Sequence, residues 1–283
     1  MAKPHVRQPG EGRRFEFGKN WESFLCGLDE SRILEAERSI KQMLEIEDLK
    51  GIQFLDIGSG SGLFSLAARR LGATVHSFDD DPLSVACTEE LKRRYFPQDA
   101  RWTIEKGDIL DMEYVSRLGR FGVVYSWGVL HHTGNMWEAL ENVIPLVEER
   151  GRLFISIYND QGHLSQLWRS VKRRYNCSSK PMRGLILLSA GAVLQTGAAL
   201  LRFLRGENPL PFKYWREKKR DRGMSVWHDL VDWVGGYPFE FAKPEEIFAF
   251  YRRKGFNLVN LKTCGGGLGC NEFIFCREAK GAT

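Results

Sequence analysis

The sequence predicts an α/β fold in which helices cover both faces of a doubly wound, mostly parallel sheet of seven strands. Short apolar runs alternate with helical patterns over the first 158 residues, as expected of a parallel sheet whose strands are joined by crossover helices. A loop with glycine at alternate positions follows the first run, and two further runs near the C-terminus are close enough to pair as a hairpin. A chain of 283 residues with 43% hydrophobic content can bury such a core.

The elements follow one another regularly up to Tyr158. Apolar residues at near-helical spacing over 31–49 predict a first helix, which Gly51 should end. Three aspartates precede Pro82 and should cap the helix that follows, because proline fits the first helical position and aspartate accepts from exposed amides. Strands are expected at 52–57, 74–78, 102–106, 123–127 and 153–158, and the intervening helices at 63–70, 83–95, 114–118 and 136–147.

This rhythm stops after Tyr158, and no strand-like segment follows for about a hundred residues. A helix over 244–253, with proline at its start and glycine after its end, and strands at 257–263 and 272–277 then complete the sheet. We therefore expect four segments: an N-terminal helical cap at 1–50, an α/β core at 51–158, a helical insertion at 159–238 and a completing segment at 239–283.

Positive charge is concentrated in the insertion, although the net charge of the chain is only +5. Residues 169–222 hold 14 Lys or Arg and three acidic residues, which leaves 27 basic and 33 acidic residues elsewhere. Within this segment lies an uncharged 18-residue run, 184–201, with arginine at each end. Basic residues beside an apolar helix suit an anionic membrane surface. A buried lid, a homodimer helix and a membrane span are the other roles compatible with the run.

Cysteine usage and the N-terminus indicate the compartment. The six cysteines form no CxxC pair, and Cys264 and Cys270 are too few for a closed zinc site, so no metal is expected. The first 18 residues lack the apolar core of a signal peptide. These features predict a reduced, cytoplasmic protein, peripheral on the inner face of the membrane if the insertion contacts lipid.

The glycine loop predicts a nucleotide-like ligand. It reads Asp56-Ile57-Gly58-Ser59-Gly60-Ser61-Gly62, and alternate glycines let a ligand approach the backbone where a Cβ would intrude. An acidic cluster, Asp79–Asp81, ends the second strand, where a doubly wound fold places a carboxylate for ribose hydroxyls. The loop differs from the G-x-G-x-x-G pattern of dinucleotide sites.

The loop resembles motif I of class I S-adenosylmethionine-dependent methyltransferases, and the resemblance extends through most of the chain outside the insertion. Phe78-Asp79-Asp80-Asp81-Pro82 resembles motif II, Gly107-Asp108-Ile109 resembles motif III, and Trp127-Gly128-Val129-Leu130-His131-His132 resembles the motif IV region. Gly122 departs from the family, which usually carries aspartate there.

This resemblance implies a Rossmann-like methyltransferase fold with S-adenosyl-L-methionine as cofactor. It implies that Asp79 holds the ribose, with Asp80 and Asp108 near the adenine. Phe17 and Trp21, before the first helix, suit either closure over the cofactor or surface packing. The expected cofactor-binding residues are Asp56, Gly58, Ser59, Gly60, Gly62, Asp79, Asp80, Gly107, Asp108, Ile109 and Trp127.

Two adjacent histidines are candidates for the chemistry. Methyl transfer from a sulfonium is a direct displacement, so the protein must align the acceptor and exclude water. A hydroxyl acceptor also loses a proton, and a histidine with pKa near neutrality suits that role. His131 and His132 follow the fourth strand at the ligand edge of the sheet. We assign His131 as the base and His132 to the substrate site, with helix capping as the structural alternative.

A second candidate region is 227–238, which gathers histidine, aspartate and aromatic residues. It is similar to the His-Asp-Trp stretch of ubiquinone-biosynthesis O-methyltransferases, which implies catalytic roles for His228 and Asp229. A structural hydrogen-bonding corner is the alternative. The further substrate-site candidates are Tyr158, Trp227, Asp232, Trp233 and Tyr237.

These features predict an enzyme that methylates a hydroxyl group of a small or lipid-like molecule. An RNA methyltransferase is the second hypothesis, because Trp168, Tyr175, Tyr214 and Trp215 interleave with basic residues. The N/D-P-P-Y/F motif typical of nucleobase amine methylation is absent from the sequence, so nucleic acid is disfavoured as a partner. A protein that binds the cofactor without catalysis is the third hypothesis.

Overall fold

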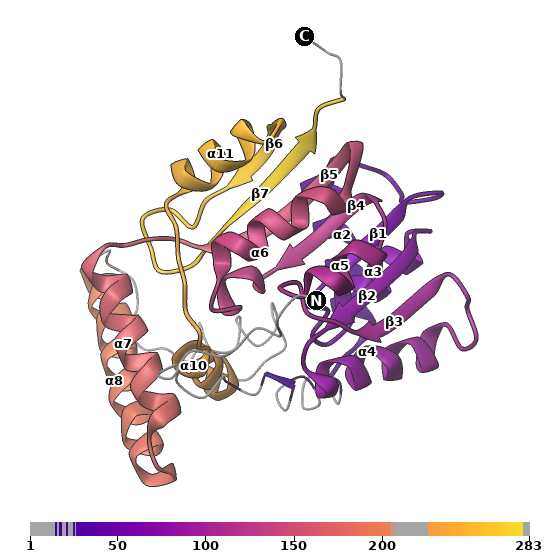
Figure 1. Cartoon of the computed structure of the whole chain (residues 1–283). Helices are drawn as coiled ribbons and strands as arrows, with labels where there is room; N and C mark the ends of the chain where they lie inside the picture. Colours follow the sequence, from indigo (N-terminus) through magenta and orange to yellow (C-terminus); the bar gives the residue numbers. More distant parts are fainter. Residues whose placement is uncertain are drawn as a thin grey trace. The chain divides into compact units, whose positions relative to one another are not determined.

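The computed structural model describes Phe15, Phe17, Gly18, Trp21, Leu25, 27–204, 206 and 226–279, of which the side chains of 198, 200–202, 226–229 and 232 are left out (Figure 1). The chain divides into two compact units, each described by itself: a larger unit of Glu16–Ser165 and Glu240–Thr283, and a smaller unit of Met1–Phe15 and Gln166–Phe239. No helix within the described residues is long and apolar enough to cross a membrane.

A seven-stranded sheet with strand order β3-β2-β1-β4-β5-β7-β6 forms the centre of the larger unit. Its strands are β1 (Gln53–Ile57), β2 (Thr74–Asp79), β3 (Trp102–Lys106), β4 (Phe121–Trp127), β5 (Val147–Tyr158), β6 (Phe256–Lys262) and β7 (Cys270–Arg277). The first five strands are parallel, and β7 is antiparallel to both β5 and β6. The predicted doubly wound, mostly parallel sheet is therefore confirmed.

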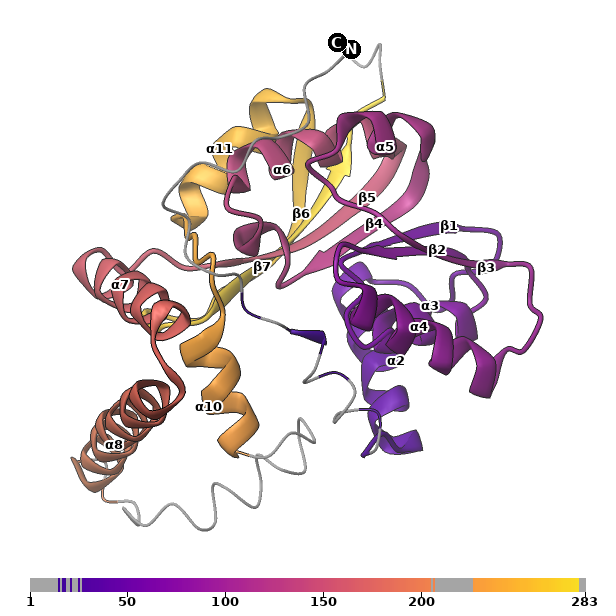
Figure 2. The same ribbon diagram turned by 60° about the horizontal axis from the view of Figure 1, so that its bottom comes forward.

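Helices cover both faces of this sheet (Figures 1 and 2). One face carries α2 (Glu30–Leu44), α3 (Leu63–Arg70) and α4 (Pro82–Tyr95), and the other carries α5 (Met112–Arg117), α6 (Met136–Val143) and α11 (Pro244–Arg253). Each face has its own apolar core, and neighbours in β1 such as Phe54 and Leu55 belong to different cores. Successive strand side chains point to opposite faces, which explains why β1 has apolar side chains on both of its faces.

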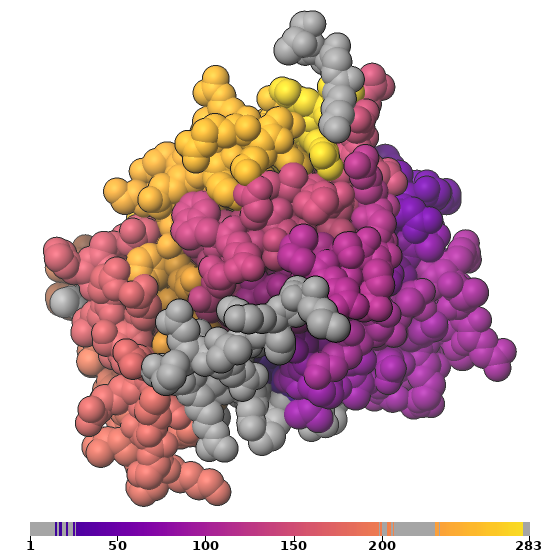
Figure 3. Space-filling model, in the orientation of Figure 1, coloured from indigo at the N-terminus to yellow at the C-terminus, as the bar shows by residue number. Residues whose placement is uncertain are grey.

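Helices α6 and α11 lie side by side on their face of the sheet (Figure 3). The Tyr251 hydroxyl of α11 donates to the carbonyl of Leu140 at 3.1 Å, and Lys254 pairs with Glu141 of α6 at 2.6 Å. Helix α11 thereby completes the apolar core on this face of the sheet.

Capping residues set several element boundaries. Asp81 caps α4 by accepting from the Leu83 amide, with Pro82 at the first helical position as predicted. Helix α2 ends earlier than expected, at Leu44, because Glu45 adopts a left-handed conformation with φ of 52°. Strand β5 begins at Val147 rather than Leu153, and the exposed, charged residues 148–150 that follow Val147 interrupt the apolar signal.

The smaller unit is helical, with α8 (Lys180–Leu204), α10 (Val226–Gly235) and most of α7 (His163–Cys177), which begins in the larger unit (Figure 2). The Arg183 guanidinium donates to the carbonyls of Tyr175, Asn176 and Ser178 and fixes the turn between α7 and α8. The side-chain amide of Asn176 donates to the Gly235 carbonyl at 2.7 Å and so gives a hydrogen-bond partner to a carbonyl at the C-terminal end of α10.

The insertion leaves and re-enters the larger unit at the same place, the C-terminal end of β5. The Asp160 amide donates to the Ala242 carbonyl at 3.1 Å, and the Ala242 amide donates to the Tyr158 carbonyl at 3.0 Å. The strand before the insertion and the segment after it are thus hydrogen-bonded to each other.

Candidate active site

The glycine loop between β1 and α3 has a backbone that side chains would not tolerate. Gly58, Gly60 and Gly62 have φ of +72°, +55° and +79°. A Cβ on Gly58 would lie 2.4 Å from the Val129 side chain, so this loop packs directly against the loop after β4. The order of strands reverses between β1 and β4, and ligands of doubly wound folds bind at that switch point.

Asp79 ties the end of β2 to the glycine loop. Its carboxylate accepts from the amides of Gly60 and Asp81, both at 2.9 Å. Burial raises the pKa of Asp79 to about 6, and the charges of Asp81 and Asp80 act in the same direction. Each carboxylate oxygen has a second lone pair, so Asp79 can still accept from ribose hydroxyls.

Asp56 lies in the interior and does not open onto the surface. Its carboxylate accepts from the Ser65 hydroxyl at 2.5 Å, Ser65 contacts the Ser77 hydroxyl at 2.7 Å, and the Trp102 indole donates to Ser77 at 2.9 Å. This buried chain joins β1, α3, β2 and β3 under the glycine loop. Desolvation raises the pKa of Asp56 to about 7.

The end of β3 supplies the next expected cofactor residues. A Cβ on Gly107 would lie 2.2 Å from the Tyr114 ring, so glycine is required there. Asp108 accepts from the Leu110 amide at 2.9 Å, and the buried Ile109 holds Asn142 through its carbonyl at 3.0 Å. These contacts fix the loop after β3.

The other predicted cofactor residues differ in exposure. The Ser59 hydroxyl contacts the Thr88 hydroxyl at 3.0 Å and is buried, whereas Asp80 is exposed. Trp127 lies at the end of β4 with 39% of its surface exposed. Trp21 packs over the glycine loop, since a Cβ on Gly60 would lie 3.1 Å from its indole ring.

An aromatic cluster stands on the β4 and β5 side of the glycine loop. His131 and His132 belong to η1 (Leu130–His132), directly after β4, and Tyr158 ends β5. The His131 ring lies 4.2 Å from Tyr158 and 4.5 Å from His132, centroid to centroid. His132 also lies 5.1 Å from Phe17. His131 is fully buried, whereas His132 and Tyr158 are half-buried.

Glu240 positions the loop that carries the histidines, and the sequence analysis did not identify it. Its amide donates to the His131 carbonyl at 3.0 Å, and its carboxylate accepts from the amides of Gly134 at 3.0 Å and Met136 at 3.1 Å. Glu240 therefore fixes the histidine turn and caps the start of α6. It lies far from the histidines in sequence and belongs to no motif, so no sequence signal identified it.

The second candidate region forms α10 and the segment after it. Trp227, His228, Asp229 and Asp232 lie on α10, but their side chains fall outside the described residues. The described residues of this region include Trp233 and Tyr237. The Trp233 ring lies 5.5 Å from the Trp168 ring, centroid to centroid, and the Tyr237 carbonyl accepts from the Phe15 amide at 3.1 Å.

The aromatic residues that suggested RNA binding are not exposed where they are described. Trp168 is 8% exposed and Tyr175 is 7% exposed, so neither offers a face on which a base can stack. Tyr214 and Trp215 lie outside the described residues.

Comparison with known proteins identifies the family. Residues 28–187, more than half of the chain, match the model of a methyltransferase domain. The ribosomal protein L11 methyltransferase of Methylococcus capsulatus is 37% identical over 73 residues, which are 25% of this chain and 25% of that protein. The chain thus spans only about a quarter of the curated relatives it matches.

Solved structures agree on the fold. Magnesium protoporphyrin IX methyltransferase from Synechocystis with bound S-adenosylhomocysteine has a TM-score of 0.52 and 15% identity, covering 95% of this chain and 90% of that one. An N-methyltransferase from Bradyrhizobium japonicum has a TM-score of 0.50 and 13% identity, covering 93% and 100%. The chain belongs to the methyltransferase-domain family, and its predicted place among class I S-adenosylmethionine-dependent methyltransferases is confirmed by family and fold.

Proposed function

We propose that this protein transfers the methyl group of S-adenosylmethionine to a hydroxyl oxygen of a small or lipid-like molecule. The observation that carries the proposal is the cluster of His131, His132 and Tyr158, which stands at the ends of β4 and β5. The Gly58–Val129 contact joins the loops of β1 and β4, so the cluster belongs to the same edge of the sheet as the glycine loop.

The geometry of the loops supports the proposed cofactor residues. The positive φ angles of the three glycines favour a loop without Cβ atoms, and Asp79 presents a carboxylate at the end of β2. Asp79 would accept from the ribose hydroxyls, and the loop after β3, with Asp108, would border the adenine. When bound, the cofactor supplies an electrophilic methyl group.

The histidine pair would manage the acceptor proton. The acceptor oxygen would bond to the methyl carbon as the carbon–sulfur bond breaks, and the acceptor proton would pass to an imidazole nitrogen, a base suited to neutral pH. His132 has open surface, whereas His131 is enclosed by His132 and Tyr158 and held through its carbonyl by Glu240. In this proposal His131 is the base if the turn that carries it moves and exposes its ring. If the turn stays in place, His132 is the base and His131 supports it.

A role for α10 belongs to the same proposal. His228 and Asp229 are assigned as additional catalytic groups, with Trp227, Asp232, Trp233 and Tyr237 bordering the acceptor. The helical insertion is assigned the partner contacts, with an anionic lipid surface and a second copy of the chain as its candidate partners.

RNA methylation and cofactor binding without catalysis are the competing functions. The burial of Trp168 and Tyr175 weighs against RNA. The histidine pair beside the glycine loop favours catalysis over cofactor binding alone.

The test is a transfer assay with labelled S-adenosylmethionine and a lysate divided into lipid, small-molecule, RNA and protein fractions. Label in an alkali-stable ether of the lipid or small-molecule fraction supports the proposal, whereas label in RNA or protein alone overturns it. Once an acceptor is found, His132→Ala and His228→Ala should each lower turnover about 100-fold without changing cofactor affinity. Unchanged turnover in a variant ends the catalytic assignment of that residue.

A further inference from the structure

Helix α8 of the smaller unit has one face packed on protein and one face in the open. Leu187 and Ala190 are buried, and a Cβ on Gly191 would lie 3.0 Å from Leu230 of α10, which marks the inner face. The opposite face carries exposed large apolar side chains at helical spacing. They are Met182, Leu185, Leu188, Val193, Phe203 and Leu204, between 41% and 71% exposed.

The polar side chains on this open face form hydrogen bonds with the backbone of α8. The Ser189 hydroxyl donates to the Leu185 carbonyl at 2.8 Å, and the Thr196 hydroxyl donates to the Ala192 carbonyl at 2.8 Å. Both hydroxyl donors are thereby satisfied by the backbone of α8 itself. Transfer of this surface from water to an apolar medium therefore costs little free energy.

The surrounding charge is of one sign. Residues 161–206, which include α7 and α8, contain no aspartate or glutamate and eight Lys or Arg. Arg174 and Lys180, beside the turn between the two helices, are exposed. A second copy of the chain would bring two positively charged hairpins together, whereas an anionic surface complements them.

We propose that the open face of α8 binds an anionic lipid membrane, with the helix axis in the plane of the membrane surface. The buried inner face excludes lipid from one side of the helix, so α8 lies at the interface. The inference rests on the proposed partner role of the insertion and is independent of the reaction. It gives a hydroxylated lipid a route to the enzyme from the membrane in which it resides.

Vesicle flotation of the full chain tests this binding without any activity measurement. The protein should float with mixed phosphatidylcholine–phosphatidylglycerol vesicles and stay at the bottom with pure phosphatidylcholine. Raising the salt to about 1 M should weaken flotation, because it shortens the screening length to about 3 Å. Equal flotation with both vesicle types, or none with either, overturns the proposal.

Matched variants locate the contact. Leu185→Gln with Leu188→Gln should lower the partition coefficient for anionic vesicles at least tenfold, and Val259→Gln with Leu261→Gln, on exposed apolar residues of β6, should leave it unchanged. Circular dichroism and thermal melting of each variant check that it folds. Equal loss in both pairs contradicts the proposal. So does a dimer, seen by sedimentation, that the α8 pair abolishes in a protein that does not float.

Discussion

Asp79 should make cofactor binding depend on pH. In the proposed site, ribose hydroxyls would donate to the ionised carboxylate of Asp79, whereas burial raises the pKa of Asp79 to about 6. Binding therefore favours loss of this proton, and the affinity should fall as the pH drops through about 6. Calorimetric titration with S-adenosylhomocysteine should give a constant Kd above about pH 7 and a Kd that rises about tenfold per unit below about pH 5.5.

Two variants separate Asp79 from other titrating groups. Asp79→Asn should weaken binding at pH 7.5 and flatten the pH profile, whereas Glu89→Gln, on the exposed side of α4, should change neither. A profile that stays steep in Asp79→Asn would assign the titration to another residue.

Asp56 should lower the stability of the protein as the pH rises. Its folded pKa of about 7 lies above the usual value of 3.8, so the native state holds a proton that the unfolded state has lost between these two values. The free energy of unfolding therefore falls with rising pH across this range. Asp56→Asn should make the free energy of unfolding depend less steeply on pH, because asparagine does not titrate. Its amide oxygen can still accept from Ser65, and chemical unfolding at several pH values measures the slope. An unchanged slope would contradict the assignment.

For single residues, the sequence offers more direct signals for the proposed cofactor site than for the proposed acceptor site. Gly58, Asp79 and Asp108 fall in short motifs at strand ends, where local sequence and tertiary position coincide. The burial of His131 depends on Tyr158 and Glu240, which arrive from other parts of the chain. No pattern around the histidines carries that information.

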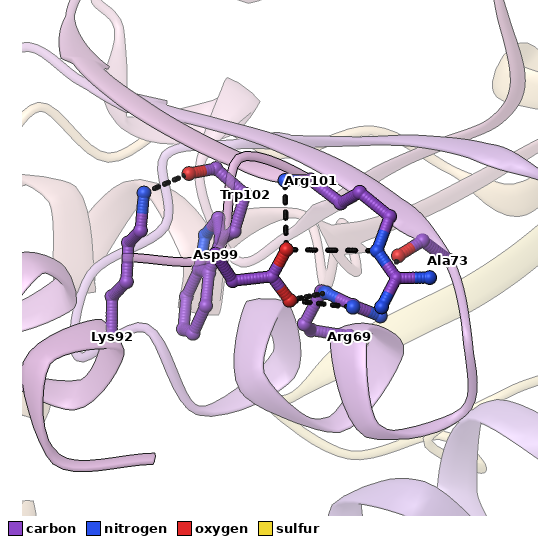
Figure 4. Close-up of polar contacts among 6 residues, drawn as sticks. All are labelled: Arg69, Ala73, Lys92, Asp99, Arg101 and Trp102. Atoms are coloured by element: carbon purple, nitrogen blue, oxygen red, sulfur yellow. Dashed lines mark hydrogen bonds and ion pairs between the residues drawn. The ribbon is translucent and has the colours of Figure 1, made fainter. Parts of the chain in front are cut away.

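Among the elements, α3 is joined to the loop between α4 and β3 by an ion pair whose arginine is buried (Figure 4). Arg69 of α3 is 4% exposed and donates twice to one carboxylate oxygen of Asp99, at 2.8 and 2.5 Å. Asp99 also accepts from the Arg101 amide at 2.9 Å, just before β3. Asp99→Ala leaves the guanidinium buried without its carboxylate, so the free energy of unfolding should fall by about 3 kcal/mol.

A matched surface pair provides the control for that experiment. Arg93 and Glu90 pair at 2.7 Å on α4, but the Arg93 side chain is 72% exposed. Arg93→Ala should leave the free energy of unfolding nearly unchanged, since exposed ion pairs contribute little. Urea unfolding monitored by circular dichroism measures both variants. A similar cost for both would show that burial does not strengthen the Arg69–Asp99 pair.

Element boundaries could be predicted where a local residue sets them and not where packing does. Pro82 and Pro244 mark the starts of α4 and α11 as predicted. At the start of β5, Val147 pairs with Phe121 of β4 at an irregular register, and the next three residues, 148–150, are charged and exposed. Such a strand owes its form to its neighbour rather than to its own pattern.

For the whole molecule, the order of elements specified the sheet but not the division into units. Parallel strands joined by helices leave few topologies open, so the doubly wound sheet could be predicted from residues 51–158 and 239–283. Helices α8 and α10 carry no such constraint. Their packing depends on contacts such as that of Gly191 with Leu230, which the hydrophobic periodicity of the sequence does not predict.

The backbone contacts at the base of the insertion lead to a last prediction. Because Asp160 and Ala242 are hydrogen-bonded to each other, a short Gly–Ser linker in place of 166–239 should leave the larger unit able to fold. The glycine loop, Asp79 and Asp108 all belong to that unit, so the shortened protein should bind S-adenosylhomocysteine with near-native affinity by calorimetry. It should neither float with anionic vesicles nor methylate a lipid-like acceptor. A folded product that has lost cofactor affinity would instead assign the smaller unit a part in holding the cofactor.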